Sequence, residues 1–233
     1  MLSPLDYAIW ALISALELGV LYCALRTRSF LRFFPLNFYM LVAFVCDVAR
    51  FIILHHYGFG SRSYHRFYYY SDALLTICLF FALTGLYSRV FKEMGAAVYV
   101  RLGAIVVLIL TAAVCFAMVR HSHPRLTASS FASELSQNLH FVGAVLTYVL
   151  WSAEKKLRET RTRLIQFTLA LGVYFSAFAA SFALAVLYPT SPYSGFATYA
   201  MGLWLPLAWG YTFLKIPENA RLQIARIAMG ARS

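Results

Sequence analysis

Charged residues are scarce in this chain of 233 residues. Asp, Glu, Lys and Arg together make up 12% of it, whereas about 25% is usual in a water-soluble protein. Hydrophobic residues make up 61%. Because a bilayer-spanning helix takes about 20 mostly apolar residues, the chain has room for about seven spans and for no sizeable soluble domain. The composition indicates an integral membrane protein and excludes a fused cytosolic kinase, nuclease or other catalytic domain.

Spacing motifs for the common cofactors are also missing. The four cysteines show no CxxC or CxxCH pattern, so a disulfide, a zinc site and covalently attached haem are not indicated. Among the six histidines, only His140 lies well inside an apolar stretch, and non-covalent haem would need a facing histidine pair. We therefore expect no cofactor and no metal ion.

Signatures of membrane enzymes and pigments are absent as well. A retinal protein needs a lysine in the middle of the last span, where the sequence offers only Lys215 at the end. Zinc amidase-like hydrolases need histidines in the last helices, and an intramembrane serine protease needs a GxSG-like turn; neither is present. The chain is therefore not expected to be an enzyme.

Seven apolar stretches are long enough to cross a bilayer. They cover roughly residues 6–25, 36–57, 67–90, 98–119, 131–153, 164–188 and 194–215. Fifteen of the 20 lysines and arginines flank these stretches on one side and four on the other, while Arg50 lies inside the second. Since basic loops remain in the cytoplasm, the sequence predicts an all-α membrane protein, a seven-transmembrane helix bundle with its N-terminus outside and its C-terminus cytoplasmic.

The basic residues predict two further features on the cytoplasmic side. Residues 1–216 form the seven-helix transmembrane domain, and residues 217–233 form a basic amphipathic cytoplasmic tail, expected to be a short helix on the inner leaflet. The fifth connection supplies a surface for anionic lipid headgroups or for a partner protein. The residues of this surface are Lys155, Lys156, Arg158, Arg161 and Arg163. Because the cations flank spans, nucleic acid is not an expected partner.

Small residues recur every fourth position in the sixth stretch, at Gly172, Ser176 and Ala180. Such a row allows helices to approach closely in a bilayer. The partner helix could belong to the same bundle or to a second copy, so a homo-oligomer remains an open alternative.

Four of the nine acidic residues lie within the body of the predicted spans: Glu17, Asp47, Asp72 and Glu134. An ionisable side chain in hydrocarbon costs several kcal/mol, so it normally faces the bundle interior and has a partner. Arg50 follows Asp47 by three residues and shares its helix face. An Asp47–Arg50 ion pair is therefore expected.

Other polar residues extend this set. Gln137 and Asn138 are expected on the face of Glu134 with His140 at its edge, and Thr76 follows Asp72 by one turn. The predicted polar interior in the outer half of the bundle consists of Glu17, Asp47, Arg50, Asp72, Thr76, Glu134, Gln137, Asn138 and His140. Four carboxylates against one arginine are unbalanced, so either some carboxyls are protonated or a cation is bound.

Three interpretations of these residues stay open: a closed hydrogen-bonded network, a ligand or cation pocket open to the outside, and a proton or ion path. The leading hypothesis is a receptor-like or sensor-like membrane protein that binds a ligand in the outer half of the bundle and acts on a partner at the cytoplasmic face. The alternatives are a small proton- or cation-coupled transporter and an accessory subunit of a membrane complex.

Two segments carry a resemblance. Phe67-Tyr-Tyr-Tyr-Ser-Asp-Ala-Leu74 at the start of the third span, and the Glu134-centred start of the fifth, resemble features of uncharacterised bacterial seven-helix integral membrane proteins. The resemblance covers the span pattern across most of the chain. It implies a multi-pass protein of the bacterial inner (plasma) membrane and no known activity.

Overall fold

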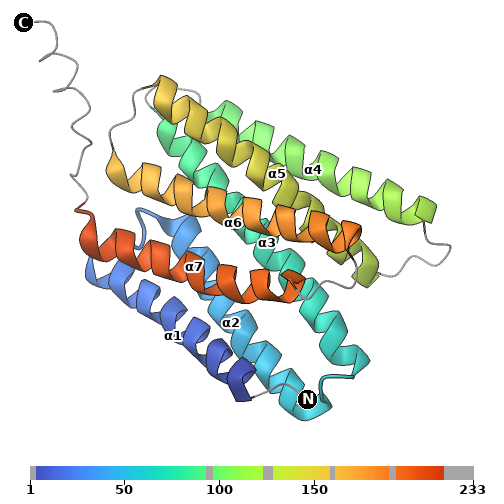
Figure 1. The fold of residues 1–233 in the computed structure, drawn as a ribbon. Helices are drawn as coiled ribbons and strands as arrows, with labels where there is room; N and C mark the ends of the chain where they lie inside the picture. The colour runs from blue at the N-terminus through green and yellow to red at the C-terminus, as the bar shows by residue number, and fades with distance from the viewer. Residues whose placement is uncertain (1–3, 93–96, 123–127, 158–160, 189–192, 218–233) are drawn as a thin grey trace, which may run out of the picture.

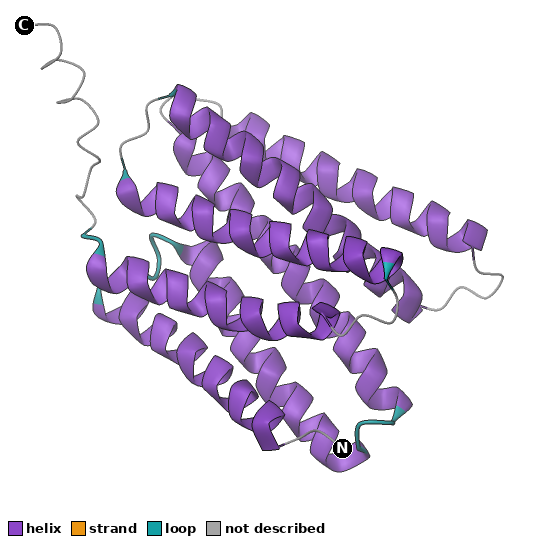
Figure 2. Ribbon diagram, viewed as in Figure 1, coloured by secondary structure: helices purple, strands orange, loops and turns teal. Residues whose placement is uncertain are grey.

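The computed structural model describes residues 4–92, 97–122, 128–157, 161–188 and 193–217. These residues form seven α-helices joined by short connections (Figures 1 and 2). The helices are α1 (Pro4–Arg26), α2 (Phe34–Tyr57), α3 (Arg62–Val90), α4 (Ala97–Ser122), α5 (Ala128–Lys156), α6 (Thr162–Leu187) and α7 (Tyr193–Lys215). Each predicted span coincides with one helix, so the all-α prediction is confirmed. The tail predicted over residues 217–233 lies outside the described residues from residue 218 onwards.

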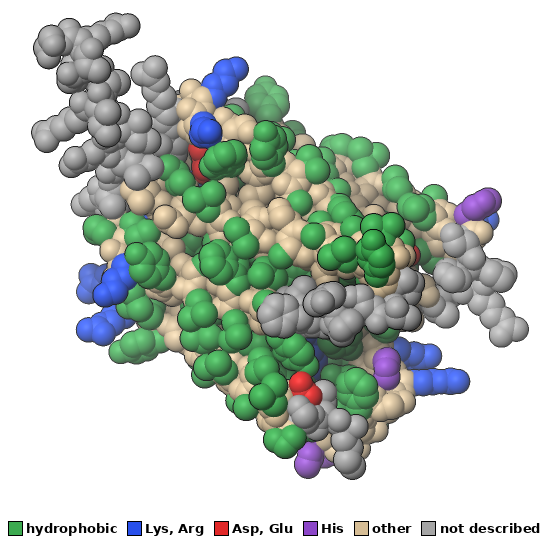
Figure 3. All heavy atoms as spheres, viewed as in Figure 1, with side chains coloured by type: hydrophobic (Ala, Val, Ile, Leu, Met, Phe, Trp, Pro, Cys, Tyr) green, Lys and Arg blue, Asp and Glu red, His purple; other side chains and the backbone are tan. Residues whose placement is uncertain are grey.

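Five of the helices are long and apolar enough to cross a membrane, namely α1, α2, α3, α4 and α6. Helices α5 and α7 have similar lengths of 29 and 23 residues. On the face drawn in Figure 3, hydrophobic side chains cover the middle of the molecule, and Lys, Arg and His gather towards its two ends. This distribution is the one expected of a membrane protein.

The helices run alternately in opposite directions (Figure 1). Helices α1, α3, α5 and α7 begin at one end of the bundle, here called the N-terminal end, and the other three begin at the opposite, C-terminal end. Local sequence explains several boundaries. Pro35 stands in the first turn of α2, where a missing N–H costs nothing. Gly58 ends α2 with a φ of 76°, and the Ser61 hydroxyl caps α3 by accepting from the Tyr64 N–H at 3.1 Å.

Six helices close into a ring and the seventh lies outside it. Neighbouring helices around the ring are α1, α2, α3, α5, α6 and α7, and α7 returns to α1. Helix α3 also touches α6 across the ring. Helix α4 packs against α3 and α5 (Figure 1). The ring therefore encloses an interior to which α4 is peripheral.

The C-terminal half of this interior is filled with aromatic side chains. Trp209, Phe167 and Phe213 are fully buried, and the Phe167 ring centroid lies 5.3 Å from that of Phe213 and 6.1 Å from that of Trp209. Phe33 joins them at 5.1 Å from Phe167. This aromatic packing fills the centre of the ring at the C-terminal end, and the cavities described below lie in the N-terminal half.

Candidate functional site

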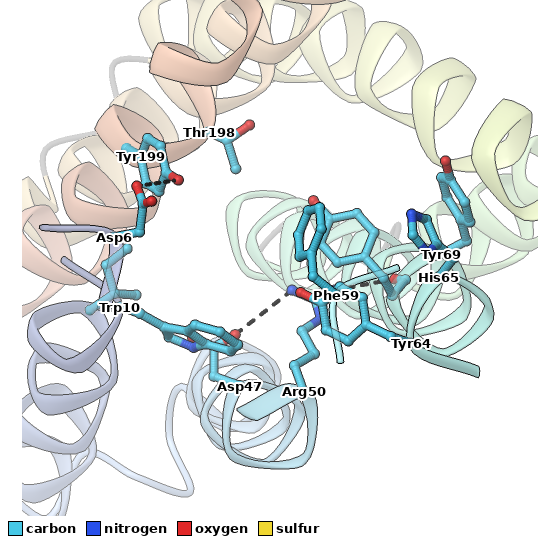
Figure 4. A pocket seen from close by; sticks show the side chains of 12 residues that line it. Asp6, Trp10, Asp47, Arg50, Phe59, Tyr64, His65, Tyr69, Thr198 and Tyr199 are labelled. Carbon is cyan, nitrogen blue, oxygen red and sulfur yellow. Dashed lines mark hydrogen bonds and ion pairs between the residues drawn. The ribbon is translucent and has the colours of Figure 1, made fainter. Parts of the chain in front are cut away.

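Two adjoining cavities occupy the N-terminal half of the ring. The outer chamber has a volume of ≈ 470 Å³ and lies between the ends of α1, α2, α3 and α7 (Figure 4). It is lined by Asp6, Trp10, Ile13, Asp47, Arg50, Phe59, Tyr64, His65, Tyr68, Tyr69, Thr198 and Tyr199.

The inner chamber lies deeper and has a volume of ≈ 420 Å³. Helices α5 and α6 contribute to its wall. It is lined by Ile13, Glu17, Tyr39, Ala43, Asp47, Arg50, Tyr68, Tyr69, Asp72, Leu75, Thr76, Ser133, Gln137, Tyr174, Phe178, Phe182, Thr198 and Gly202. Asp47 and Arg50 line both chambers, so the two cavities meet at this pair.

The expected Asp47–Arg50 pair is present, with Arg50 Nη1 3.7 Å from Asp47 Oδ1 (Figure 4). Helix α3 also holds the guanidinium: Arg50 Nε donates to Ser71 Oγ at 2.7 Å and Nη2 to the Tyr68 carbonyl at 3.4 Å. The guanidinium carbon lies 4.7 Å from the centroid of the Tyr68 ring. Arg50 is thus fixed between α2 and α3, at the boundary between the chambers.

Asp72 is tied to α5 across the helix interface. The Ser136 hydroxyl donates to Asp72 Oδ2 at 2.6 Å and lies 3.0 Å from the Thr76 hydroxyl. Thr76 also donates to the Asp72 carbonyl at 2.9 Å. Asp72 and Thr76, one turn apart on α3, both line the chamber and are both linked to α5 through Ser136.

Glu17 lies deeper than the other acids of the inner chamber, and its side chain is less fully paired. It is only 6% exposed, and its Oε2 atom has no hydrogen-bond partner among the described residues. Leaving a buried polar atom unpaired costs about 1–3 kcal/mol. The neighbouring hydroxyls of Tyr39 and Tyr174 hydrogen-bond to each other. Glu17 therefore lines the inner chamber and carries a buried oxygen atom without a partner among the described residues.

Glu134 and Asn138 lie at the contact between α5 and α4. The Asn138 side-chain amide donates to Cys115 Sγ at 3.2 Å, and Cys115 Sγ donates to the Glu134 carbonyl at 3.8 Å. Gln137 instead lines the inner chamber. Glu134, Gln137 and Asn138 were predicted to share one face of the helix. In the structure Glu134 and Asn138 lie towards α4, and Gln137 lies towards the ring interior.

His140 occupies a third environment. Its Nδ1 donates to the Ser136 carbonyl at 2.7 Å, and the ring packs against aromatic side chains of α6. These are Tyr174, Phe175, Phe178 and Phe182, with centroids 4.8–6.0 Å away. His140 is a buried, hydrogen-bonded core residue behind the chamber wall.

The predicted cytoplasmic surface is only partly formed by exposed side chains. Lys155 and Lys156 are exposed at the end of α5, and Arg158 lies outside the described residues. Arg161 donates to the Arg89 carbonyl at 3.3 Å. The prediction of a surface position is wrong for Arg163. Its side chain is only 7% exposed, because its guanidinium donates to main-chain carbonyls at the end of α7.

Several side chains of the site were not predicted from the sequence. Ser71 and Ser136 hold Arg50 and Asp72, and Asp6 accepts a hydrogen bond from the Tyr199 hydroxyl at 3.0 Å. Ser136 could have been predicted from its spacing, because it stands four residues before His140 and so lies on the same helix face. Ser71 and Asp6 carried no comparable signal.

Comparison with known proteins gives no family assignment. No protein-family model, curated protein or solved structure matches this chain. The chambers and their side chains are therefore the basis for the function proposed below.

Proposed function

We propose that this protein is a seven-span, multi-pass protein of the bacterial inner (plasma) membrane that binds a small polar ligand in the two chambers and acts as a receptor or sensor. The carrying observation is the pair of adjoining cavities that meet at Asp47 and Arg50. Ligand sites are concave, mostly apolar and contain a few well-placed polar groups. The inner chamber has this character.

The charge distribution supports access from outside the cell. Fifteen lysines and arginines flank the spans at the C-terminal end and four at the N-terminal end, which favours a cytoplasmic C-terminal end. The outer chamber is lined by residues near the opposite helix ends, including Asp6, Phe59 and Tyr199. A ligand would therefore enter from the outer aqueous phase.

The closed floor of the inner chamber favours binding over passage. The Tyr39 ring centroid lies 5.8 Å from that of Trp209, and Trp209 is fully buried with Phe167 and Phe213. A carrier would need a second arrangement in which this aromatic core opens. A binding protein needs only the arrangement described. In this proposal, the exposed Lys155 and Lys156 face a partner protein or anionic headgroups.

Cysteine accessibility tests the proposal. Ser133→Cys places a nearly isosteric thiol on the inner chamber, and Ser136→Cys places the same group three residues away at a buried, hydrogen-bonded position. We expect a membrane-impermeant methanethiosulfonate, added to intact cells, to modify the first variant and not the second. The parent chain measures the background from its own four cysteines. Modification of Ser133→Cys only from the cytoplasmic side, or not at all, would contradict the proposal.

A further inference from the structure

We infer that the ligand of the inner chamber is a protonated amine with a small apolar body, and that Glu17 is its counter-ion. The inference rests on the proposed function and adds the chemical class of the ligand. It follows from the charges, the unpaired acceptor and the walls of the inner chamber.

The charged side chains that line the chamber are three acids and one base: Glu17, Asp47, Asp72 and Arg50. Arg50 is paired with Asp47 and hydrogen-bonded to α3, and Asp72 accepts from Ser136. Glu17 has the greatest remaining capacity, because its Oε2 is buried without a partner among the described residues. An ionised carboxyl is costly in a low-dielectric interior, and a cation placed beside Glu17 would stabilise its ionised form.

The unpaired atom also specifies the kind of cation. A carboxylate oxygen can only accept hydrogen bonds, so the ligand must bring a donor, and a donor that also carries positive charge is the N–H group of a protonated amine. A quaternary ammonium has none. A metal ion would need several oxygen ligands at once, and the described residues contain no group of three or more His, Cys, Asp or Glu side chains that could hold one.

The walls of the inner chamber suit the rest of such a ligand. Aromatic side chains from two helices line the inner chamber: Tyr39, Tyr174, Phe178 and Phe182. Aromatic faces attract cations and pack against apolar groups. The volume of ≈ 420 Å³ falls within the range of about 300–1,000 Å³ typical of small-molecule sites.

A matched set of probes tests this inference on the purified protein in lipid nanodiscs. Phenethylammonium has the charge and hydrogen-bond donors, phenethyltrimethylammonium has the charge alone, and 2-phenylethanol has a donor O–H without the charge. We expect saturable binding of phenethylammonium by calorimetry, at least about tenfold tighter than that of the other two, because a hydrogen bond to a charged group contributes that much.

Two variants separate the site from its surroundings. Glu17→Gln keeps the shape and removes the charge, and should weaken phenethylammonium binding by at least about tenfold. Glu134→Gln alters the acid beside Cys115 on the α4 side and should leave binding unchanged. As a measurement that needs no change at Glu17, phenethylammonium should protect Ser133→Cys from modification, whereas 2-phenylethanol should not.

Each outcome is decisive. Absence of saturable amine binding, equal binding of the alcohol, or unaltered amine binding by Glu17→Gln would overturn the inference. If Ser133→Cys is modified from outside while the amine fails to bind, the ligand class is wrong and the proposed function stands. If Ser133→Cys is inaccessible from outside, the proposed function fails together with the inference.

Discussion

Arg163 joins three segments of the chain at the C-terminal end of the bundle. Its Nε donates to the Ile216 carbonyl at 2.6 Å, Nη2 to the Phe213 carbonyl at 3.5 Å, and Nη1 to Ser29 Oγ at 3.3 Å. The last carbonyls of a helix have no partner within it, and a cation there is favoured by the helix dipole. Arg163 therefore completes the end of α7.

Replacing Arg163 by lysine should lower the stability of the protein. The lysine ammonium is a compact point charge and cannot reproduce the planar fork of the guanidinium. We expect a loss of about 2 kcal/mol, measured as a lower Tm of the purified protein in detergent. Lys156→Ala, at an exposed position, should change stability by no more than about 0.5 kcal/mol. Equal melting of the two variants would show that the Arg163 hydrogen bonds contribute little.

The sequence allowed the ion pair within one helix to be predicted and missed the contacts between helices. Asp47 and Arg50 are three residues apart, so helical geometry alone places them together. The contacts of Ser136 with Asp72 and of Arg163 with Ile216 join residues 64 and 53 positions apart. Such contacts depend on how helices pack, which residue spacing does not encode. The predicted fifth stretch ends at residue 153 and leaves out Glu154. In the structure Glu154 is buried and accepts a hydrogen bond from Thr168 at 2.7 Å, another contact between helices.

Helix α5 distributes its polar residues over separate faces. At 3.6 residues per turn, Ser133, Ser136, Gln137 and His140 fall on one side, whereas Glu134 and Asn138 lie about a third of a turn further round. From residue spacing, Glu134, Gln137 and Asn138 were expected to share one face of the helix, with His140 at its edge. In the structure, α5 stands between the ring interior and α4, so both sides have helical neighbours.

Gly143 lets α5 approach α6 closely. A Cβ atom at this position would lie 2.5 Å from the Phe175 ring, and Phe175 is fully buried. Gly143→Ala should therefore destabilise the protein by about 1–3 kcal/mol, the usual cost of overpacking. A reduced Tm and less monodisperse protein after extraction would be the measured result.

Gly103 on α4 provides the matched control. A Cβ atom there meets nothing within 4 Å, and alanine is the better helix former by about 0.5–1 kcal/mol. Gly103→Ala should melt at the same temperature as the parent or slightly above it. If both alanine variants behaved alike, the proposed close packing at Gly143 would be wrong.

At the scale of the whole molecule, the positions of the helices along the chain could be predicted from the sequence, but their arrangement in space could not. Long apolar stretches bounded by charges located all seven helices to within a few residues of their observed ends. The ring order, and the place of α4 outside it, could not be read from the chain. Helix α4 is apolar on all its faces, so its sequence gives no preference for one neighbour over another.

The orientation of the whole bundle in the membrane can be tested with reporter fusions. The excess of cations at the C-terminal end should keep that end in the cytoplasm. A green fluorescent protein fused after Ser233 should fluoresce in bacterial cells, and alkaline phosphatase fused at Gly60 should be active. The reverse pattern would invert the bundle and place the mouth of the outer chamber in the cytoplasm.

Closure of the ring by α7 against α1 has a consequence for biosynthesis. Helix α1, which carries Glu17, leaves the ribosome before α7, the helix that packs against it in the ring. Until then the carboxyl must be sheltered by lipid headgroups, water or the insertion machinery. The chambers are therefore complete only once α7 has packed into the ring, and a nascent chain arrested before α7 lacks one of their walls.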